Sequence, residues 1–194
     1  MVTRLLETPW RSRGYLPHFD QPGLVQGITF RLADSLPQSV LEQLDEELRG
    51  LQEVPRKVER RERIAKYLDR GAGECHLQDP RVATRVANTL LHFDGIRYSL
   101  LGWCIMPNHV HAVLETKAGY GLDLVLHAWK SFSAKKANEI LDRRGRFWQR
   151  DYYDRFIRDE DHLLRALRYV ENNPVVAGLV ERAEDWQWSS ARRR

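Results

Sequence analysis

The stretch WCIMPNHVHAVLE, residues 103–115, decides the fold, because two strands and the turn between them meet in it. The length and apolar content of Ile96–Ile105 predict a first strand. Met106-Pro107-Asn108 is typical of a turn. The alternation of apolar and polar residues that starts at His109 predicts a second strand. The two strands are therefore expected to pair as a hairpin.

His109 and His111 alternate with apolar residues in the second strand. Successive side chains of a strand point to opposite faces, so both imidazoles look one way while Val110, Ala112 and Leu114 face the core. Two imidazoles so placed can offer two nitrogen ligands to one metal ion. Two ligands alone do not make a site, and a strand with a half-polar outer face is the alternative.

A second pattern lies downstream, where apolar residues recur at helical spacing, namely Leu163, Leu164, Leu167 and Val170. Tyr169 lies about 150° around the helix from the centre of this apolar stripe, so it is not placed as a core residue. Asn173 follows four residues later on the same face. The proline after Asn173 predicts that the helix ends there. The alternative is a solvent-facing tyrosine beside a helix-terminating Asn-Pro pair.

These patterns together resemble the REP-associated tyrosine transposases, which are relatives of the single-tyrosine HUH transposases of bacterial insertion sequences. The resemblance runs from about Pro17 to Ser190 and is carried by the order and spacing of its blocks. The matching blocks are Met106–His111, Phe147–Arg155, Tyr169 with Asn172–Val175, and Asp185–Ser190.

The resemblance implies a role for each of four residues. Tyr169 would be the nucleophile, His109 and His111 two metal ligands, and Asn173 the third ligand. Better-known insertion-sequence members often have a glutamine at the third position, and an asparagine has a shorter reach. The family expectation for the cofactor is Mg²⁺ or Mn²⁺, although imidazole ligands alone suit zinc or manganese better than magnesium.

The activity implied by the resemblance is a metal-dependent single-stranded DNA endonuclease and strand transferase. Its substrate would be palindromic hairpin DNA of the REP type, and its chemistry that of DNA transposition. Attack by a phenolate leaves a covalent 5′-phosphotyrosine and a free 3′ hydroxyl, so the bond energy is kept for rejoining. The main alternative is a non-catalytic DNA hairpin-binding protein that retains the fold. A metal-dependent phosphohydrolase of small substrates is a third possibility, but no small-ligand motif supports it.

Other histidine and cysteine chemistries are excluded by counting. Histidine-triad hydrolases need a third alternating histidine, and position 113 is Val113. Phosphoesterases with paired His-x-Thr or His-x-Ser motifs need two copies, which the sequence lacks. A zinc finger is excluded because Cys75 and Cys104 are isolated from each other.

The order of elements predicts an α+β fold in one domain spanning 1–194. We expect a ferredoxin-like antiparallel sheet with helices on one face, as in the family. An arm at 1–22 precedes a strand at Leu24–Leu32, and a helical insertion at 36–93 follows that strand. After the hairpin come a helix at Leu122–Leu141 and the tyrosine helix from about Glu160.

Charge and aromatic residues suggest where DNA could bind. The chain has 31 basic and 27 acidic residues and a formal net charge of +4, which a solvated surface largely explains. Interleaved aromatic and basic residues can stack on bases and hold phosphates, although a packed loop with core aromatics is the alternative. The candidate DNA contacts are Arg13, Tyr15, Lys130, Lys135, Trp148, Arg150, Tyr152 and Arg155.

Tyr152 and Tyr153 are rival nucleophiles, ranked below Tyr169 because neither has an amide one helical turn later. Two distant cysteines indicate reduced thiols and a cytoplasmic protein. The sequence shows no signal peptide and no apolar run long enough to span a bilayer. We therefore expect a protein of the bacterial cytoplasm, associated with the nucleoid, without a membrane partner, as a monomer or homodimer.

Overall fold

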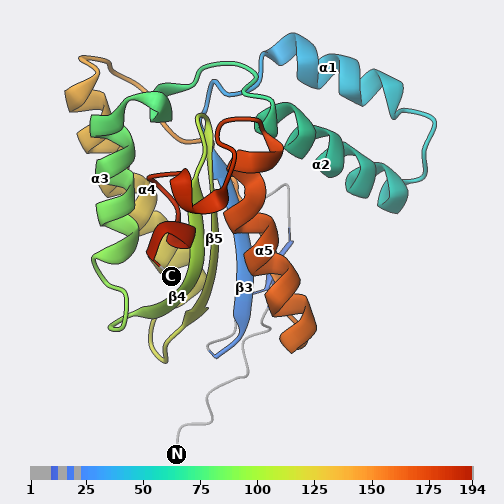
Figure 1. Cartoon of the computed structure of the whole chain (residues 1–194). Coiled ribbons are helices and arrows are strands. Elements are labelled where there is room, and N and C mark those ends of the chain that lie inside the picture. The colour runs from blue at the N-terminus through green and yellow to red at the C-terminus, as the bar shows by residue number, and fades with distance from the viewer. Residues whose placement is uncertain (1–9, 13–16, 20–22, 194) are drawn as a thin grey trace, which may run out of the picture.

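The protein, a computed structural model, is built around a four-stranded antiparallel sheet with the strand order β4-β5-β3-β6 (Figure 1). The structure describes residues 10–12, 17–19 and 23–193. The sheet strands are β3 (Val25–Arg31), β4 (Tyr98–Ile105), β5 (His109–Thr116) and β6 (Tyr153–Phe156). The helices are α1 (Gln38–Glu47), α2 (Glu53–Asp69), α3 (Pro80–Leu91), α4 (Leu122–Ile140) and α5 (Glu160–Val176).

The connections between these strands give the ferredoxin-like arrangement. Along the chain the sheet is built as β3-α3-β4-β5-α4-β6, and each neighbouring pair of strands is antiparallel. A strand–helix–strand repeated twice, with the first strand of each half in the centre of the sheet, is the split βαβ pattern. The predicted α+β class and antiparallel sheet are thus confirmed.

The predicted hairpin is formed by β4 and β5, with Ile105 opposite Val110. Met106 closes the turn by donating its backbone N–H to the carbonyl of His109 at 2.9 Å. The first strand begins at Tyr98 instead of Ile96, whose side chain is exposed. The hairpin places the histidine strand in the interior of the sheet, because β3 pairs along the other edge of β5.

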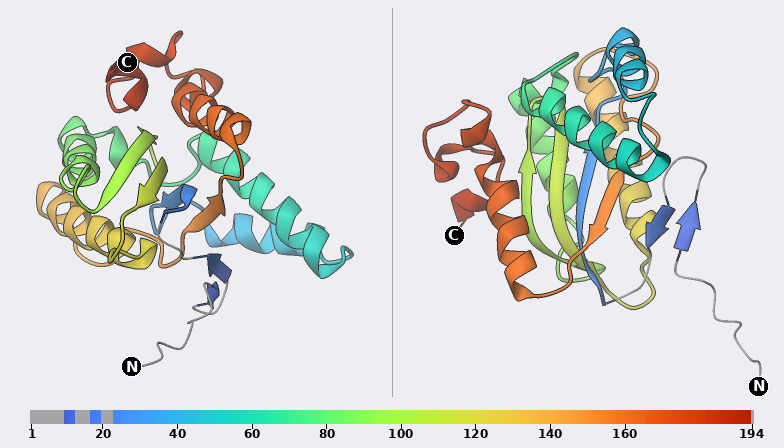
Figure 2. Two further views of the ribbon diagram at one scale, coloured as in Figure 1. Left: turned by 90° about the horizontal axis from the view of Figure 1, so that it is seen from below. Right: turned by 90° about the vertical axis from the view of Figure 1, so that its right-hand side faces the viewer.

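Helices cover both faces of the sheet, which corrects the expectation of helices on one face. The crossover helices α3 and α4 pack on one face, where Phe30, Val110 and Leu114 belong to the larger core. Helix α5 packs on the opposite face, where Leu167 and Val170 contact Cys104 and Val113. The left view of Figure 2 shows the two layers on either side of the strands. The two helices of the ferredoxin-like unit, α3 and α4, do lie on one face, as expected. Helix α5, which follows β6 in the chain, lies on the other face.

The region expected as a helical insertion divides into two parts. α3 lies within 36–93 but is a crossover helix, because Val82, Val86 and Leu90 are buried against the sheet. Asp79 caps it by accepting the backbone N–H of Arg81, with a proline at the first helical position. The helices that project from the sheet are α1 and α2 (Figure 1).

Two ion pairs join α1 and α2. Arg60 binds Asp45 and Arg63 binds Glu47 across the two helices. The N-terminal arm contains a short strand pair, since β1 (Trp10–Ser12) pairs with β2 (Pro17–Phe19). Across the part of the chain that the structure describes, no helix combines the length and apolar character needed to cross a membrane.

Candidate active site

His109 and His111 lie side by side on the α5 face of the sheet. Their Nε2 atoms are 2.8 Å apart, and their rings meet edge to face. His109 is fully buried and His111 is 3% exposed. The alternation of β5 therefore places both imidazoles on one face, as the sequence predicted, and apolar residues on the other.

Asn108 fixes which nitrogen of His109 carries the proton. Its Nδ2 donates to the carbonyl of Ala72 at 2.7 Å, so its Oδ1 is the atom that faces His109 Nδ1 at 2.7 Å. That nitrogen must donate, which leaves the lone pair of a neutral His109 on Nε2. A second-shell hydrogen bond to the far nitrogen is usual for histidines that bind metal.

His111 is held in a similar way by the neighbouring strand. Its Nδ1 is 2.8 Å from Thr29 Oγ1, on β3. Burial, and then the neighbouring His109, hold the pKa of His111 well below its ordinary value. The imidazole is therefore neutral at physiological pH, which is the form that binds a metal ion.

A glycine in β4 leaves room for the Leu167 side chain, with which α5 packs on the sheet. A Cβ at Gly102 would meet Leu167 Cδ2 at 2.5 Å, which is closer than real contacts allow. Asp159 caps the helix by accepting the N–H of His162. The close packing of α5 on β4 fixes where the side chains of its next turns lie.

Asn173 points into the site from α5. Its Nδ2 is 3.2 Å from His111 Nε2, and its Oδ1 is buried without a hydrogen-bond partner. A half-turn of the amide would exchange these two atoms and present the oxygen to the histidines. The expectation that the helix ends at Asn173 was wrong. Pro174 lies inside the helix, and the carbonyl of Asn173 still accepts from Ala177 N.

Tyr169 stands beside the histidines at the edge of the site. Its side chain is 50% exposed, and its ring lies 5.3 Å from the ring of His111. Burial raises the pKa of Tyr169 to about 12, the charge of Asp69 adds to the rise, and a hydrogen bond with Asn173 partly offsets it. The phenol is protonated at neutral pH, so a reaction through its oxygen requires help from a nearby positive charge.

Asp69, the last residue of α2, is the site residue that the sequence did not reveal. Its Oδ1 is 3.4 Å from His109 Nε2, and it has no hydrogen-bond partner. The ligand atoms of Asp69, His109 and His111 all lie within 4.8 Å of one another. No local motif marks this aspartate, because it stands in a charged helix far from the histidines in sequence.

Most of the candidate DNA contacts lie elsewhere. Trp148 is 4% exposed and donates its indole N–H to Ser133 Oγ, so it is a core residue that cannot stack on a base. Tyr152 packs against the same core, beyond the sheet from the histidines. The packed-loop alternative is the right one for these two aromatics.

The basic candidates divide between the two faces. Lys130 and Lys135 belong to α4, and Lys130 donates to the carbonyl of Arg150 at 2.7 Å. Arg155 is exposed and pairs with Gly27, which places it on the face of the histidines. Arg13 and Tyr15 lie outside the described residues.

The rival tyrosines are farther from the histidines than Tyr169. Tyr153 is separated from His111 by Thr29, its partner on β3, and the guanidinium of Arg61 lies 4.4 Å from its ring centre. Tyr152 lies on the opposite side of the sheet. The geometry thus favours Tyr169 as the tyrosine next to the histidine pair.

Comparison with known proteins places this site in a family. The family model described as IS200-like transposase matches residues 80–173, which contain both histidines, Tyr169 and Asn173. Residues 80–173 are therefore similar to the IS200-like transposase family. The resemblance found in the sequence is confirmed.

Two proteins of Haemophilus influenzae are similar to this chain. One, named as a REP-associated tyrosine transposase, is 30% identical over 101 residues, or 46% of this chain and 57% of the relative. The other, an uncharacterised protein, is 32% identical over 97 residues, or 37% of this chain and 52% of the relative. The similarity thus spans little more than half of each relative.

A solved structure shares the fold. A REP-associated tyrosine transposase bound to a REP hairpin superimposes with a TM-score of 0.58, covering 93% of this chain and 84% of that chain. The sequence identity is 14%, so this similarity concerns the fold.

Proposed function

We propose that this chain is a metal-dependent single-stranded DNA endonuclease and strand transferase that acts on hairpin DNA. The observation that carries the proposal is the contact of Tyr169 with His111, which belongs to a pair of buried histidines whose Nε2 atoms are 2.8 Å apart. The family of residues 80–173 and the solved relative bound to a REP hairpin support the same chemistry and substrate.

The residues around the histidines fit a divalent metal ion. Asn108 leaves the lone pair of a neutral His109 on Nε2, which faces His111 Nε2, and Asn173 Oδ1 is buried without a partner. Two imidazole nitrogens and a carboxamide oxygen are donors that Mn²⁺ accepts. A divalent ion held by His109, His111 and Asn173 would polarise the scissile phosphate and stabilise the negative charge that develops on it.

Tyr169 supplies the nucleophile in this proposal. Its phenol gives up a proton as its oxygen attacks phosphorus. The bond from phosphorus to the 3′ oxygen breaks, and that oxygen gains a proton to become a free 3′ hydroxyl. The 5′ end stays on Tyr169 as a phosphodiester of similar energy, so a 3′ hydroxyl can later reverse the step and rejoin strands.

Exposed arginines on the catalytic face are suited to hold the DNA backbone. Arg165 is exposed and lies one turn before Tyr169 on the same side of α5. Arg155 is exposed on β6, on the same face of the sheet. We expect these two side chains, and not those of α4, to contact the phosphates that flank the scissile bond.

A cleavage assay tests the proposal. Labelled single-stranded hairpin DNA is incubated with the protein and Mn²⁺, and products are separated on a denaturing gel. The proposal predicts a cut strand and a slower covalent adduct, both abolished by chelator and by His109→Ala with His111→Ala. The alternative, a non-catalytic hairpin-binding protein, predicts retention of hairpin DNA on a native gel with no cut strand under any metal.

A further inference from the structure

Asp69 faces the histidine pair with a carboxylate oxygen that accepts no hydrogen bond. Its Oδ1 lies 3.4 Å from His109 Nε2 and is buried without a hydrogen-bond partner. Because Asn108 assigns the proton of neutral His109 to Nδ1, the lone pair of Nε2 is turned toward this carboxylate. A lone pair facing an anionic oxygen is unfavourable unless a cation lies between them.

Asp69 is held in place by the loop that follows it, residues 70–77. The carbonyl of Ala72 accepts from Asn108, and Leu77 N donates to the carbonyl of Pro107 at 3.0 Å. These bonds tie the loop to the turn that begins the histidine strand. The same Asn108 side chain therefore orients His109 with its oxygen and anchors the aspartate loop with its nitrogen.

A second anchor ties this loop to the end of β3. Glu74 N donates to the carbonyl of Asp34 at 3.1 Å. A Cβ at Gly73, whose φ is +70°, would collide with the backbone carbonyl of Ser35. The loop therefore lies so close to the backbone after β3 that only glycine fits at this position.

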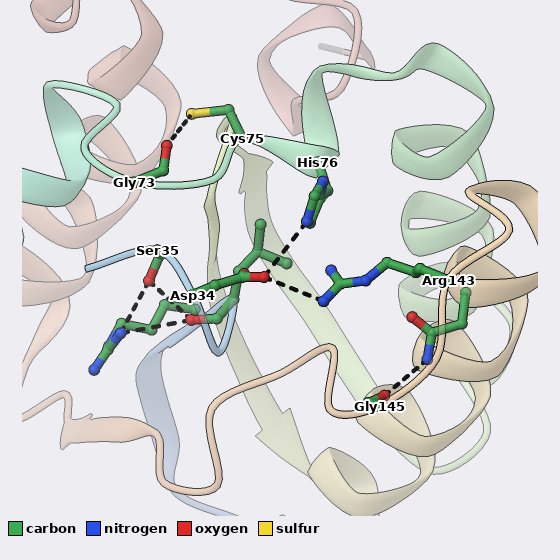
Figure 3. A network of polar contacts seen from close by, with 10 residues as sticks. Asp34, Ser35, Gly73, Cys75, His76, Arg143 and Gly145 are labelled. Carbon is green, nitrogen blue, oxygen red and sulfur yellow. Dashed lines mark hydrogen bonds and ion pairs between the residues drawn. The ribbon is translucent and has the colours of Figure 1, made fainter. Parts of the chain in front are cut away.

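The Asp34 side chain connects this anchor to a third segment of the chain. Figure 3 shows its carboxylate between His76 and Arg143. Oδ2 of Asp34 is 3.1 Å from Arg143 Nη2 and 3.5 Å from His76 Nε2. This polar cluster fixes the later part of the loop, at Glu74 and His76, relative to the end of β3.

We infer that Asp69 is an additional, anionic ligand of the metal site, so that the α1–α2 insertion completes the catalytic centre. This inference rests on the proposed metal-dependent function. The carboxylate would join two imidazoles and a carboxamide, and it would give an otherwise neutral donor set one negative charge. Carboxylate oxygens are the donors that Mg²⁺ and Mn²⁺ prefer, so Asp69 favours these ions over zinc.

Direct metal binding tests the inference without relying on turnover. Free Mn²⁺ is measured by its electron paramagnetic resonance signal while it is titrated into the full chain without DNA. Compared with the unaltered protein, Asp69→Asn is expected to weaken Mn²⁺ binding by at least about tenfold. Zn²⁺, measured by competition, is expected to lose less. Glu62→Gln is the matched control, because this exposed residue lies two turns before Asp69 on α2, outside the Asp69–His109–His111 cluster, and loses the same charge.

The outcomes separate this inference from the proposed function. Equal Mn²⁺ affinity in Asp69→Asn and the unaltered chain, together with loss in His111→Ala, overturns the role of Asp69 and keeps the histidine site. No binding by the unaltered chain removes the metal centre and the role of Asp69 with it. Circular dichroism checks that each variant folds. If Asp69→Asn folds poorly, Asp69→Ala is used in its place. An equal loss in Glu62→Gln would show that the effect is general charge and contradict a specific ligand.

Discussion

Asn108 controls the histidine site at the scale of single residues. It contacts His109 through its oxygen and the aspartate loop through its nitrogen. Its neighbour His109 can present Nε2 to a metal only while the far nitrogen is paired in this way. The site thus depends on a residue that would touch neither the metal nor the DNA.

Asn108→Ala is expected to weaken Mn²⁺ binding by roughly 10–100-fold while the chain still folds, because the orientation of His109 is lost. The measurement is the same Mn²⁺ titration, with thermal unfolding as the check on folding. Asn138→Ala is a suitable control, since Asn138 also donates to a backbone carbonyl but lies on α4. Unchanged Mn²⁺ affinity in Asn108→Ala would mean that this contact does not prepare the site.

The proposed metal ligands are expected to differ in how much their removal reduces the cleavage rate. His109→Ala or His111→Ala should abolish metal-dependent cleavage, because each removes a buried donor and several kcal/mol of charge stabilisation, about 3 kcal/mol or more. Asn173→Ala should reduce the rate less, since a water molecule can replace a neutral oxygen ligand. Single-turnover cleavage rates over a range of Mn²⁺ concentrations measure this, and a larger loss in Asn173→Ala than in His109→Ala would contradict the order.

The sequence predicted some of these residues for a physical reason. The alternation of strand side chains is a local rule, so it placed His109 and His111 on one face before any fold was known. Helical spacing likewise put Tyr169 and Asn173 together. Asp69 could not be found in this way, because only the tertiary path of the loop after α2 brings it to His109.

Gly102 controls the position of the tyrosine at the scale of elements. It lies in β4 where the pairing register with β5 shifts, and it leaves the space that Leu167 of α5 fills. Because α5 carries both Tyr169 and Asn173, the distance between helix and sheet sets the geometry of the site.

Gly102→Ala is expected to force the Leu167 side chain aside and so disturb the packing of α5 on β4. The free energy of unfolding should fall by about 1–3 kcal/mol, and cleavage should fall more than hairpin binding. Gly27→Ala is its control on β3 of the same sheet, where an added Cβ would meet atoms at 3.9 Å, an ordinary contact. Chemical unfolding and cleavage rates are the measurements. Wild-type cleavage by Gly102→Ala would show that α5 is not constrained by this contact.

The elements themselves were predicted better than their packing. Strand β3, the β4–β5 hairpin and the helices of the ferredoxin-like unit can be predicted from local periodicity. Periodicity does not tell which apolar stripe meets which face of a sheet. For that reason the sequence does not separate α3 from the α1–α2 insertion, and it does not show that α5 packs on the face opposite α3 and α4. Trp148 was misassigned for the same reason, since burial of an aromatic block is decided by tertiary contacts.

The face of the sheet that carries the histidines and the proposed nucleophile is the one that α5 and β6 border. Trp148 and Tyr152 pack into the core beyond the sheet, and the α4 lysines lie on that side. The exposed Arg155 and Arg165 lie on the side of the histidines. We therefore expect DNA to approach from the α5 side.

Arg165→Ala is expected to lower the slope of log affinity against log salt for hairpin DNA by about 0.7 to 0.9, the value for one lost phosphate contact. Lys135→Ala, a charge removed from the opposite side, should leave the slope unchanged. Hairpin binding by a catalytically inert Tyr169→Phe chain, titrated at several salt concentrations, separates the two. Equal slopes for both variants would place the DNA elsewhere.

The identity of the nucleophile is the central claim, and mapping the covalent adduct tests it most directly. The chain is incubated with single-stranded hairpin DNA and Mn²⁺, digested with nuclease and trypsin, and analysed by mass spectrometry. Cleavage after arginine separates Tyr169, in residues 169–182, from Tyr152 and Tyr153, in residues 151–155. The account predicts a nucleotide on Tyr169 and no adduct in Tyr169→Phe. A nucleotide on Tyr152 or Tyr153, or an adduct that persists in Tyr169→Phe, would contradict it.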